Sequence, residues 1–151
     1  MTLASLGACG WLTAPVPEGQ ERLTEERDMA EVVIRDLLDG HSGGTACVEV
    51  DDEDPDAAFL ARFADLPFVV KADSACGWSS EELYTRVIVD LSTGEIARSV
   101  GFGDVSWDSG ERATARGGWL VADLVGEILV YHLEKVRGAW RIRRKEAEGV
   151  F

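Results

Sequence analysis

Basic residues are scarce in this 151-residue sequence, which has 15 lysines and arginines against 28 aspartates and glutamates and a formal net charge of −13. A chain with this balance repels the phosphate backbone of nucleic acid at long range, which argues against nucleic acid as a partner. No apolar run approaches the roughly 20 residues that a membrane-spanning helix needs. The acidity is explained by solubility alone, although it would also attract a basic protein or a cationic small molecule.

Cysteine and histidine are rare as well. The three cysteines form no CxxC pair and have no histidine nearby, so neither a metal site nor a cofactor is predicted. Cys47 lies near the end of the first predicted core strand and Cys76 in the loop after the second, so the two could form a disulfide in an exported protein. In a reducing cytosol they would be ordinary thiols, and the sequence leaves both alternatives open.

Motifs of the common enzyme classes are also absent: there is no nucleophile elbow, Walker loop, dinucleotide fingerprint or zinc-protease motif. The two histidines, His41 and His132, lie in no recognisable catalytic triad. The acidic run at residues 51–56 lacks the alternating spacing and the glycine of a calcium-binding EF-hand loop. We interpret this run as a solvated cluster at the N-terminus of a helix.

Residues 1–17 are expected to form a flexible arm or the remnant of a signal sequence, followed by a single α+β domain over residues 18–151. The stretch Leu6-Gly7-Ala8-Cys9 loosely resembles a lipobox, but no basic residue precedes Cys9, whereas a secretory signal begins with a basic region. The chain as it stands is expected to be cytoplasmic, and exported or lipid-anchored if its true start lies upstream of Met1.

Two helices are predicted. Residues 18–39 carry apolar side chains at helical spacing, and Gly40 is a natural stop, so they predict one long helix whose apolar stripe needs a sheet to cover. Asp54 as N-cap and Pro55 as the first helical residue predict a second, short helix that ends at about Asp65.

Strand signals dominate the rest of the sequence. They predict strands over residues 46–50, 67–72, 83–91, 96–100, 104–107, 112–121, 126–136 and 140–145. Because the later strands follow one another without helices, the predicted fold class is α+β, with the long N-terminal helix packed on a curled antiparallel sheet. The pair Gly117-Gly118 inside a long strand predicts a bulge or bend that lets the sheet curl.

The last predicted hairpin, from Val130 to Ile142, resembles the closing hairpin of the cystatin-like and nuclear-transport-factor-2-like cone folds. Residues 46–142 are similar to small uncharacterised bacterial proteins, often exported, that share a Gly-Gly-aromatic strand. The resemblance implies a cystatin-like architecture and a bacterial source, but no activity. Val121 and Val125 stand where those proteins carry two cysteines, so the disulfide that the resemblance implies there is absent.

Two sets of candidate functional residues follow. Cone folds often hold a pocket between helix and sheet, so His132, Tyr131, Tyr84 and Asp90 are candidate catalytic residues, with the histidine as general base and a tyrosine as donor to an oxyanion. The alternative is a strand histidine at the surface or hydrogen-bonded to a neighbour. A basic patch on the last strands could instead bind a partner. Its members are Arg112, Arg116, Lys135, Arg141, Arg143 and Lys145. The alternative for this patch is cross-strand pairing with Glu127 and Glu134 that guards an edge strand.

The sequence therefore favours a non-enzymatic binding or interaction protein that uses its acidic helix side or its basic hairpin against a protein partner. The alternative is a small cone-fold enzyme or small-molecule-binding protein with His132 and Tyr131 or Tyr84 in a pocket between helix and sheet. A monomer is favoured over a homodimer, because outward arginines on the last strands would repel one another across a two-fold contact.

Overall fold

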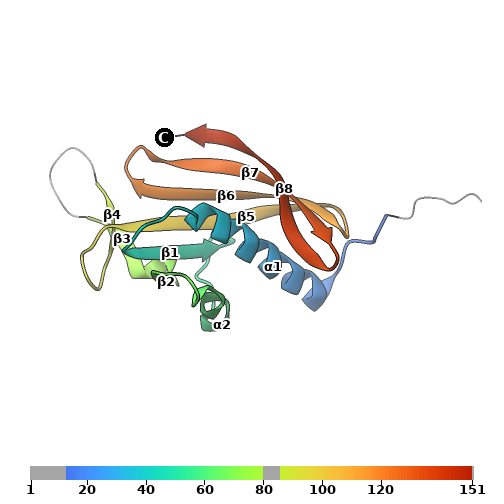
Figure 1. Ribbon diagram of the computed structural model, residues 1–151, viewed down its shortest axis with the longest axis horizontal. Helices are drawn as coiled ribbons and strands as arrows, with labels where there is room; N and C mark the ends of the chain where they lie inside the picture. The colour runs from blue at the N-terminus through green and yellow to red at the C-terminus, as the bar shows by residue number, and fades with distance from the viewer. Residues whose placement is uncertain (1–12, 80–85, 151) are drawn as a thin grey trace, which may run out of the picture.

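The computed structural model describes residues 13–79 and 86–150, and most of this part of the chain is β-strand (Figure 1). Two α-helices are present in it, α1 (Gly19–Leu38) and α2 (Ala57–Leu60), together with the short 3-10 turns η1 (Ala61–Phe63) and η2 (Asp73–Ala75). The strands are β1 (Thr45–Val50), β2 (Val69–Ala72), β3 (Cys76–Trp78), β4 (Ile88–Asp90), β5 (Ala97–Ser109), β6 (Arg112–Ala122), β7 (Val125–Val136) and β8 (Ala139–Val150).

The main sheet is mixed, with the strand order β2-β1-β5-β6-β7-β8, and β3 and β4 form a separate antiparallel pair. Strand β1 runs parallel to both β2 and β5, whereas β5 to β8 are antiparallel. The predicted fold class, a long N-terminal helix packed on a curled antiparallel, cystatin-like sheet, is therefore wrong. The segment between β1 and β2 contains α2 and η1, and such a crossover returns the chain to the sheet in a parallel orientation.

Strand β5 shows a second difference from the predicted pattern. The sequence predicts two strands separated by a turn at residues 101–103, but β5 is continuous over 13 residues, with a bulge between Gly103 and Ser106. Gly101 pairs with Glu49 of β1, and a Cβ at Gly101 would lie 3.0 Å from the Glu49 carboxylate oxygen. The glycine therefore makes room for a neighbouring side chain and does not form a turn.

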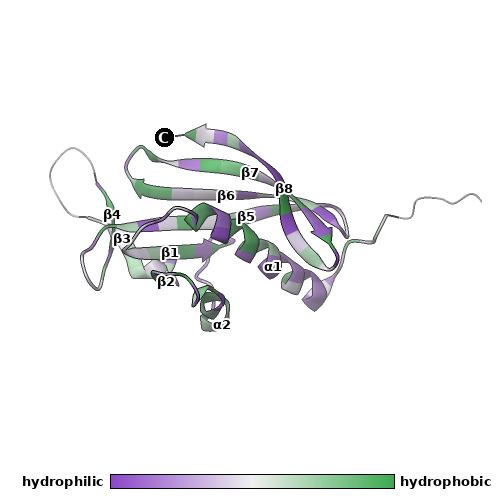
Figure 2. Cartoon of the chain, viewed as in Figure 1, coloured by the Kyte–Doolittle hydropathy of each residue, from purple (hydrophilic) through white to green (hydrophobic). Residues whose placement is uncertain are grey.

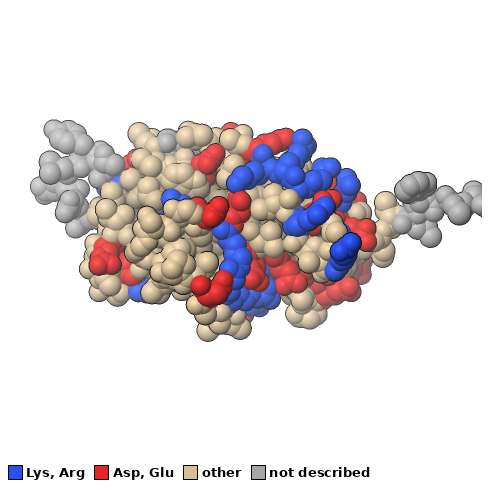
Figure 3. All heavy atoms as spheres, in the orientation of Figure 1, with Lys and Arg blue, Asp and Glu red and all other residues tan. Residues whose placement is uncertain are grey.

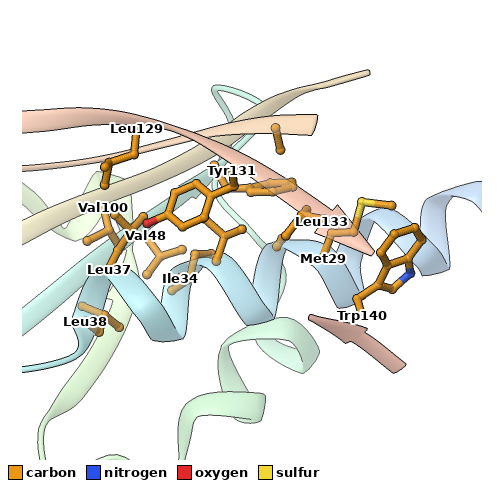
Figure 4. Packing of buried hydrophobic residues seen from close by; sticks show 14 of the residues in the cluster. Met29, Ile34, Leu37, Leu38, Val48, Val100, Leu129, Tyr131, Leu133 and Trp140 are labelled. Atoms are coloured by element: carbon orange, nitrogen blue, oxygen red, sulfur yellow. The ribbon is translucent and has the colours of Figure 1, made fainter. Parts of the chain in front are cut away.

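The helix predicted over residues 18–39 is present, and α1 crosses the front face of the sheet in Figure 1. Its first turns are hydrophilic, and its hydrophobic residues gather toward its C-terminal end (Figure 2). The buried ones are Met29, Ala30, Val33, Ile34, Leu37 and Leu38. Figure 4 shows Tyr131 and Leu133 of β7 directed toward this side of α1. These residues, with Val48 and Val100 of neighbouring strands, form the hydrophobic core.

The predicted bulge at Gly117-Gly118 is not present, because β6 and β7 stay in register through both glycines. A Cβ at Gly117 would lie 2.8 Å from the Tyr131 ring and 2.8 Å from Val33 of α1. Gly117 therefore allows the helix and Tyr131 to approach β6 closely.

Helix α2 begins later and is shorter than predicted. Its N-cap is Asp56, whose carboxylate accepts a hydrogen bond of 2.8 Å from the Phe59 backbone. Asp54, predicted to be the cap, instead accepts hydrogen bonds from the backbone and hydroxyl of Ser74. The acidic run thus connects the β1–α2 segment to η2 as well as capping a helix.

The N-terminal arm is described only from Thr13 onward, so the predicted arm or signal remnant over residues 1–12 lies outside the described residues. The backbone carbonyl of Ala14 accepts a hydrogen bond of 2.7 Å from Gly110, at the turn between β5 and β6. No helix within the described residues is long and apolar enough to cross a membrane.

Candidate functional site: an acidic groove on the sheet

The predicted catalytic residues do not come together. Tyr131 and His132 are neighbours on β7 and therefore point to opposite faces of the sheet. Tyr131 is fully buried and donates a hydrogen bond of 2.8 Å to Asp36 of α1, and its burial, followed by this bond, raises its pKa well above the usual range. His132 lies on the other face, with its Nε2 atom 3.7 Å from a Glu146 carboxylate oxygen. Tyr84 is outside the described residues.

Asp90 is buried at the opposite end of the sheet and has a structural role. Its carboxylate accepts hydrogen bonds from Thr45 (2.6 Å), Lys71 (2.7 Å) and Ser92 (2.7 Å). The Lys71 ammonium, followed by the hydroxyls of Thr45 and Ser92, holds the pKa of Asp90 well below its usual range. Asp90 therefore stays charged and connects β4 to β1 and β2.

Cys47 and Cys76 are joined by a disulfide whose Cα atoms are 6.1 Å apart. Cys47 alternates along β1 with Ala46 and Val48, which face α1 in the core, so the disulfide lies on the opposite face of the sheet. Together with Asp90, it attaches the β3–β4 pair to one end of that face. A groove lies on the remaining part of this face.

The predicted basic patch is largely neutralised. Lys135 and Lys145 reach α1, where they pair with Glu25 and Asp36. Arg116 pairs with Asp104 and Glu148, and Arg141 with Glu134. Within the described residues, Arg112 and Arg143 form no ion pair, and both are exposed. Lysines and arginines do gather over the β7–β8 hairpin in Figure 3, but acidic residues are interspersed among them.

A groove of about 720 Å³ lies on the face of the sheet turned away from α1 and extends over β1, β5, β6, β7 and β8. Val100 and Phe102 of β5 are buried in the core, so the alternate residues Ser99, Gly101 and Gly103 face the groove. One basic residue, Arg116, lines it beside five acidic side chains. The acidic residues are Glu49, Asp51, Asp52, Asp104 and Glu148. The side chain of Glu127 lies on the α1 face, where it accepts a hydrogen bond from Trp119.

Glu49 and Asp51 are electrostatically strained. Burial, followed by the nearby charges of Asp73 and Asp52, raises the pKa of Glu49. Desolvation raises the pKa of the more exposed Asp51 as well, and the carboxylates around it add to this effect. Neither residue has a lysine or arginine within salt-bridge distance among the residues that the structure describes. The charged form of both side chains is therefore less favourable in the free protein than it would be in water.

A tight turn places two of the acidic residues at the edge of the groove. Asp51 and Asp52 have positive φ angles of 54° and 62°, and Val50 and Glu53 on either side exchange backbone hydrogen bonds of 2.9 and 3.1 Å. Two-residue turns of this kind require positive φ at both central residues and favour aspartate there. The turn, together with Asp104, holds carboxylates at the groove.

The groove does not form a metal site. Across residues 13–79 and 86–150, no group of three or more histidine, cysteine, aspartate or glutamate side chains is placed to hold a metal ion. The acidic run after β1 is visible in the sequence, but the groove is not, because it forms only when β1 pairs in parallel with β5. This pairing sets Glu49 against Gly101, and the alternate glycines at 101 and 103 are a sign of it in the sequence.

Comparisons with known proteins show no related family, sequence or structure. No protein-family model matches the chain, no characterised protein is significantly similar to it in sequence, and no solved structure is significantly similar to it in fold. The function is therefore inferred from the groove itself.

Proposed function

We propose that this protein is a non-catalytic binding protein whose acidic groove receives a positively charged segment of a protein partner. The observation that carries the proposal is the pair Glu49 and Asp51, which lie in a groove with five acidic side chains and one arginine and whose pKa values are raised. A cation placed between them would stabilise their charged forms, so binding a cation relieves a cost that the free protein carries.

The size of the groove favours a polypeptide over a single amine. It extends over five neighbouring strands, and strands lie about 4.8 Å apart, which gives a span of roughly 19 Å. An extended chain advances about 3.3 Å per residue, so the groove accommodates roughly six residues. Glycine backbone at Gly101, Gly103 and Gly118 forms part of the lining and leaves room for side chains of the partner.

The catalytic alternative has less support. His132 and Tyr131 lie on opposite faces, and the space between α1 and the sheet is filled by the core. General acid–base catalysis requires the participating groups within hydrogen-bond reach of one substrate, which this arrangement does not provide.

Fluorescence anisotropy with a labelled peptide of alternating lysine and glycine tests the proposal. The double variant Glu49→Gln/Asp51→Asn should bind about tenfold more weakly, because it removes two ion pairs that together contribute on the order of 1–2 kcal/mol. The control variant Glu21→Gln/Asp39→Asn removes two charges from the ends of the helical segment, outside the groove. Equal weakening by both variants would show only a general charge effect and would contradict a groove-specific site.

A further inference from the structure

A second cavity, of about 430 Å³, lies at one end of the sheet between the loop that follows α1 and the first residues of β5. His41 and Gly44 line it from the loop, and Ile96 and Arg98 from the β4–β5 segment. Figure 3 shows that the surface over the α1–β1 loop is formed largely by uncharged residues. This region therefore differs from the acidic groove on the other face of the sheet.

Arg98 is the most informative residue of this cavity. Its guanidinium lies over the Trp119 ring, 4.8 Å from the ring centre, and one of its N–H groups donates a hydrogen bond of 3.1 Å to the Leu37 carbonyl. Its Nε atom is buried and has no hydrogen-bond partner among the described residues. Burial lowers the pKa of Arg98, and no carboxylate of the described residues lies within salt-bridge distance of it.

Other arginines of the chain either pair with carboxylates or are exposed to water. Arg35 and Arg62, which are also partly buried, each pair with two carboxylates. Arg112 and Arg143, which form no ion pair within the described residues, are exposed to water. A half-buried guanidinium without a carboxylate is costly unless an anion reaches it. The contact with Leu37 at the end of α1 uses one of its five N–H donors.

His41 adds a second polar side chain to the cavity. Its ring packs edge-on against Phe68 at a centroid distance of 4.6 Å, and its Nε2 atom is buried without a hydrogen-bond partner in the described part of the chain. His41 and Arg98 both line this cavity, and burial, followed by the charge of Arg98, lowers the pKa of His41. Two side chains from separate segments thus line one cavity, and each carries a buried nitrogen atom without a hydrogen-bond partner among the described residues.

We propose that this cavity binds a small monocarboxylate, with its oxyanion held by Arg98 and His41 and its short apolar tail against Ile96 and Val121. A carboxylate fits better than a phosphate because the single charge of Arg98 balances a single negative charge. Glu95 also lines the cavity, and the C-terminal end of α1 lies beside Arg98, so a dianion would be repelled. The planar guanidinium matches the two oxygens of a carboxylate.

Titration of the ¹⁵N-labelled protein with hexanoate, followed at the Nε–H resonance of Arg98, tests this inference. We expect a saturable shift with a dissociation constant of about 1 mM or lower, within the range expected for a ligand of this size. Acetate should bind more weakly because it lacks the tail, and inorganic phosphate more weakly because of its second charge. The absence of a saturable shift, or preference for phosphate, would overturn the proposal.

Variants locate the site independently. Arg98→Gln should abolish hexanoate binding, while Arg112→Gln, which removes an exposed arginine and changes the net charge equally, should leave it unchanged. His41→Gln should weaken binding and retains the Arg98 resonance as a probe, so the test does not depend on whether Arg98→Gln folds. Equal binding by wild type, Arg98→Gln and His41→Gln would overturn the assignment of the site.

Discussion

Replacing Gly117 by alanine adds one methyl group at the place where α1, β6 and β7 meet. The new Cβ would lie 2.8 Å from the Tyr131 ring, 2.8 Å from Val33 and 3.1 Å from Leu37. Carbon atoms in contact are separated by at least about 3.5 Å, so two of these neighbours must move by roughly 0.7 Å within a packed core.

The expected magnitude follows from two opposing terms. Overpacking a core costs about 1–3 kcal/mol, and replacing a glycine inside a strand recovers about 0.5–1 kcal/mol of that cost. Gly117→Ala should therefore lower the free energy of unfolding by about 1–2 kcal/mol. For a chain of this length, this corresponds to a fall in Tm of about 2–8 °C.

Thermal and urea denaturation measure this change, and Gly149→Ala provides a matched control. A Cβ at Gly149 meets nothing within 4 Å, so this variant should stay within about 0.5 kcal/mol of the wild type. A Gly117→Ala protein as stable as the Gly149→Ala protein would refute the close approach of α1 to β6.

Three further predictions concern the other face and its charges. Asp90→Asn should lower Tm at pH 7, because it leaves the Lys71 ammonium partly buried without its carboxylate. The pKa of Asp90 is lowered in the folded state, so its contribution to the free energy of unfolding is fully present above the ordinary aspartate pKa of about 3.9 and is lost as the pH falls further. The Tm of the variant should therefore depend less on acid pH than the Tm of the wild type. Reducing the disulfide between Cys47 and Cys76, 29 residues apart, should cost about 3–4 kcal/mol in urea denaturation, and no change on reduction would contradict its stabilising role. Glu49→Gln/Asp51→Asn should raise Tm at pH 7, because both carboxylates have raised pKa values and their charged forms oppose folding. The gain should disappear at acid pH, where both groups are protonated in the wild type. A lower Tm at pH 7 would show that these charges stabilise the fold.

Local patterns in the sequence predicted individual elements well. The apolar spacing of α1 reflects burial along one side of a helix, and this signal is contained within 20 consecutive residues. The extents of β6 and β7 agree with prediction to within one residue at each end for the same reason, since alternation and turn residues are local properties.

Strand pairing was not predictable from these patterns. Whether β1 pairs with β5 in parallel depends on where the intervening β2 and the β3–β4 pair lie, and alternation within a strand carries no information on its neighbour's direction. The glycines at 101 and 103 were interpreted as a turn because glycine favours turns when only local sequence is considered. In the folded protein they lie against Glu49 and Asp51.

The candidate site was missed for the same reason. Its acidic side chains come from β1, the segment after it, β5 and β8, and only the tertiary pairing brings them together. Within the predicted basic patch, Lys135 and Lys145 reach across to Glu25 and Asp36 of α1. These pairs were not predictable from the strands, because cross-strand neighbours are the only partners that a local pattern indicates.

The most direct test of the proposed function is to locate the bound peptide on the protein. Glycine amide resonances of the ¹⁵N-labelled protein would be followed during titration with the lysine–glycine peptide. Gly101, Gly103 and Gly118 line the acidic groove, and their amides should shift together and saturate, while those of Gly40 and Gly138, outside the groove, should not move. Saturable binding that shifts residues on α1 or the β7–β8 hairpin and leaves the groove glycines unchanged would contradict the account.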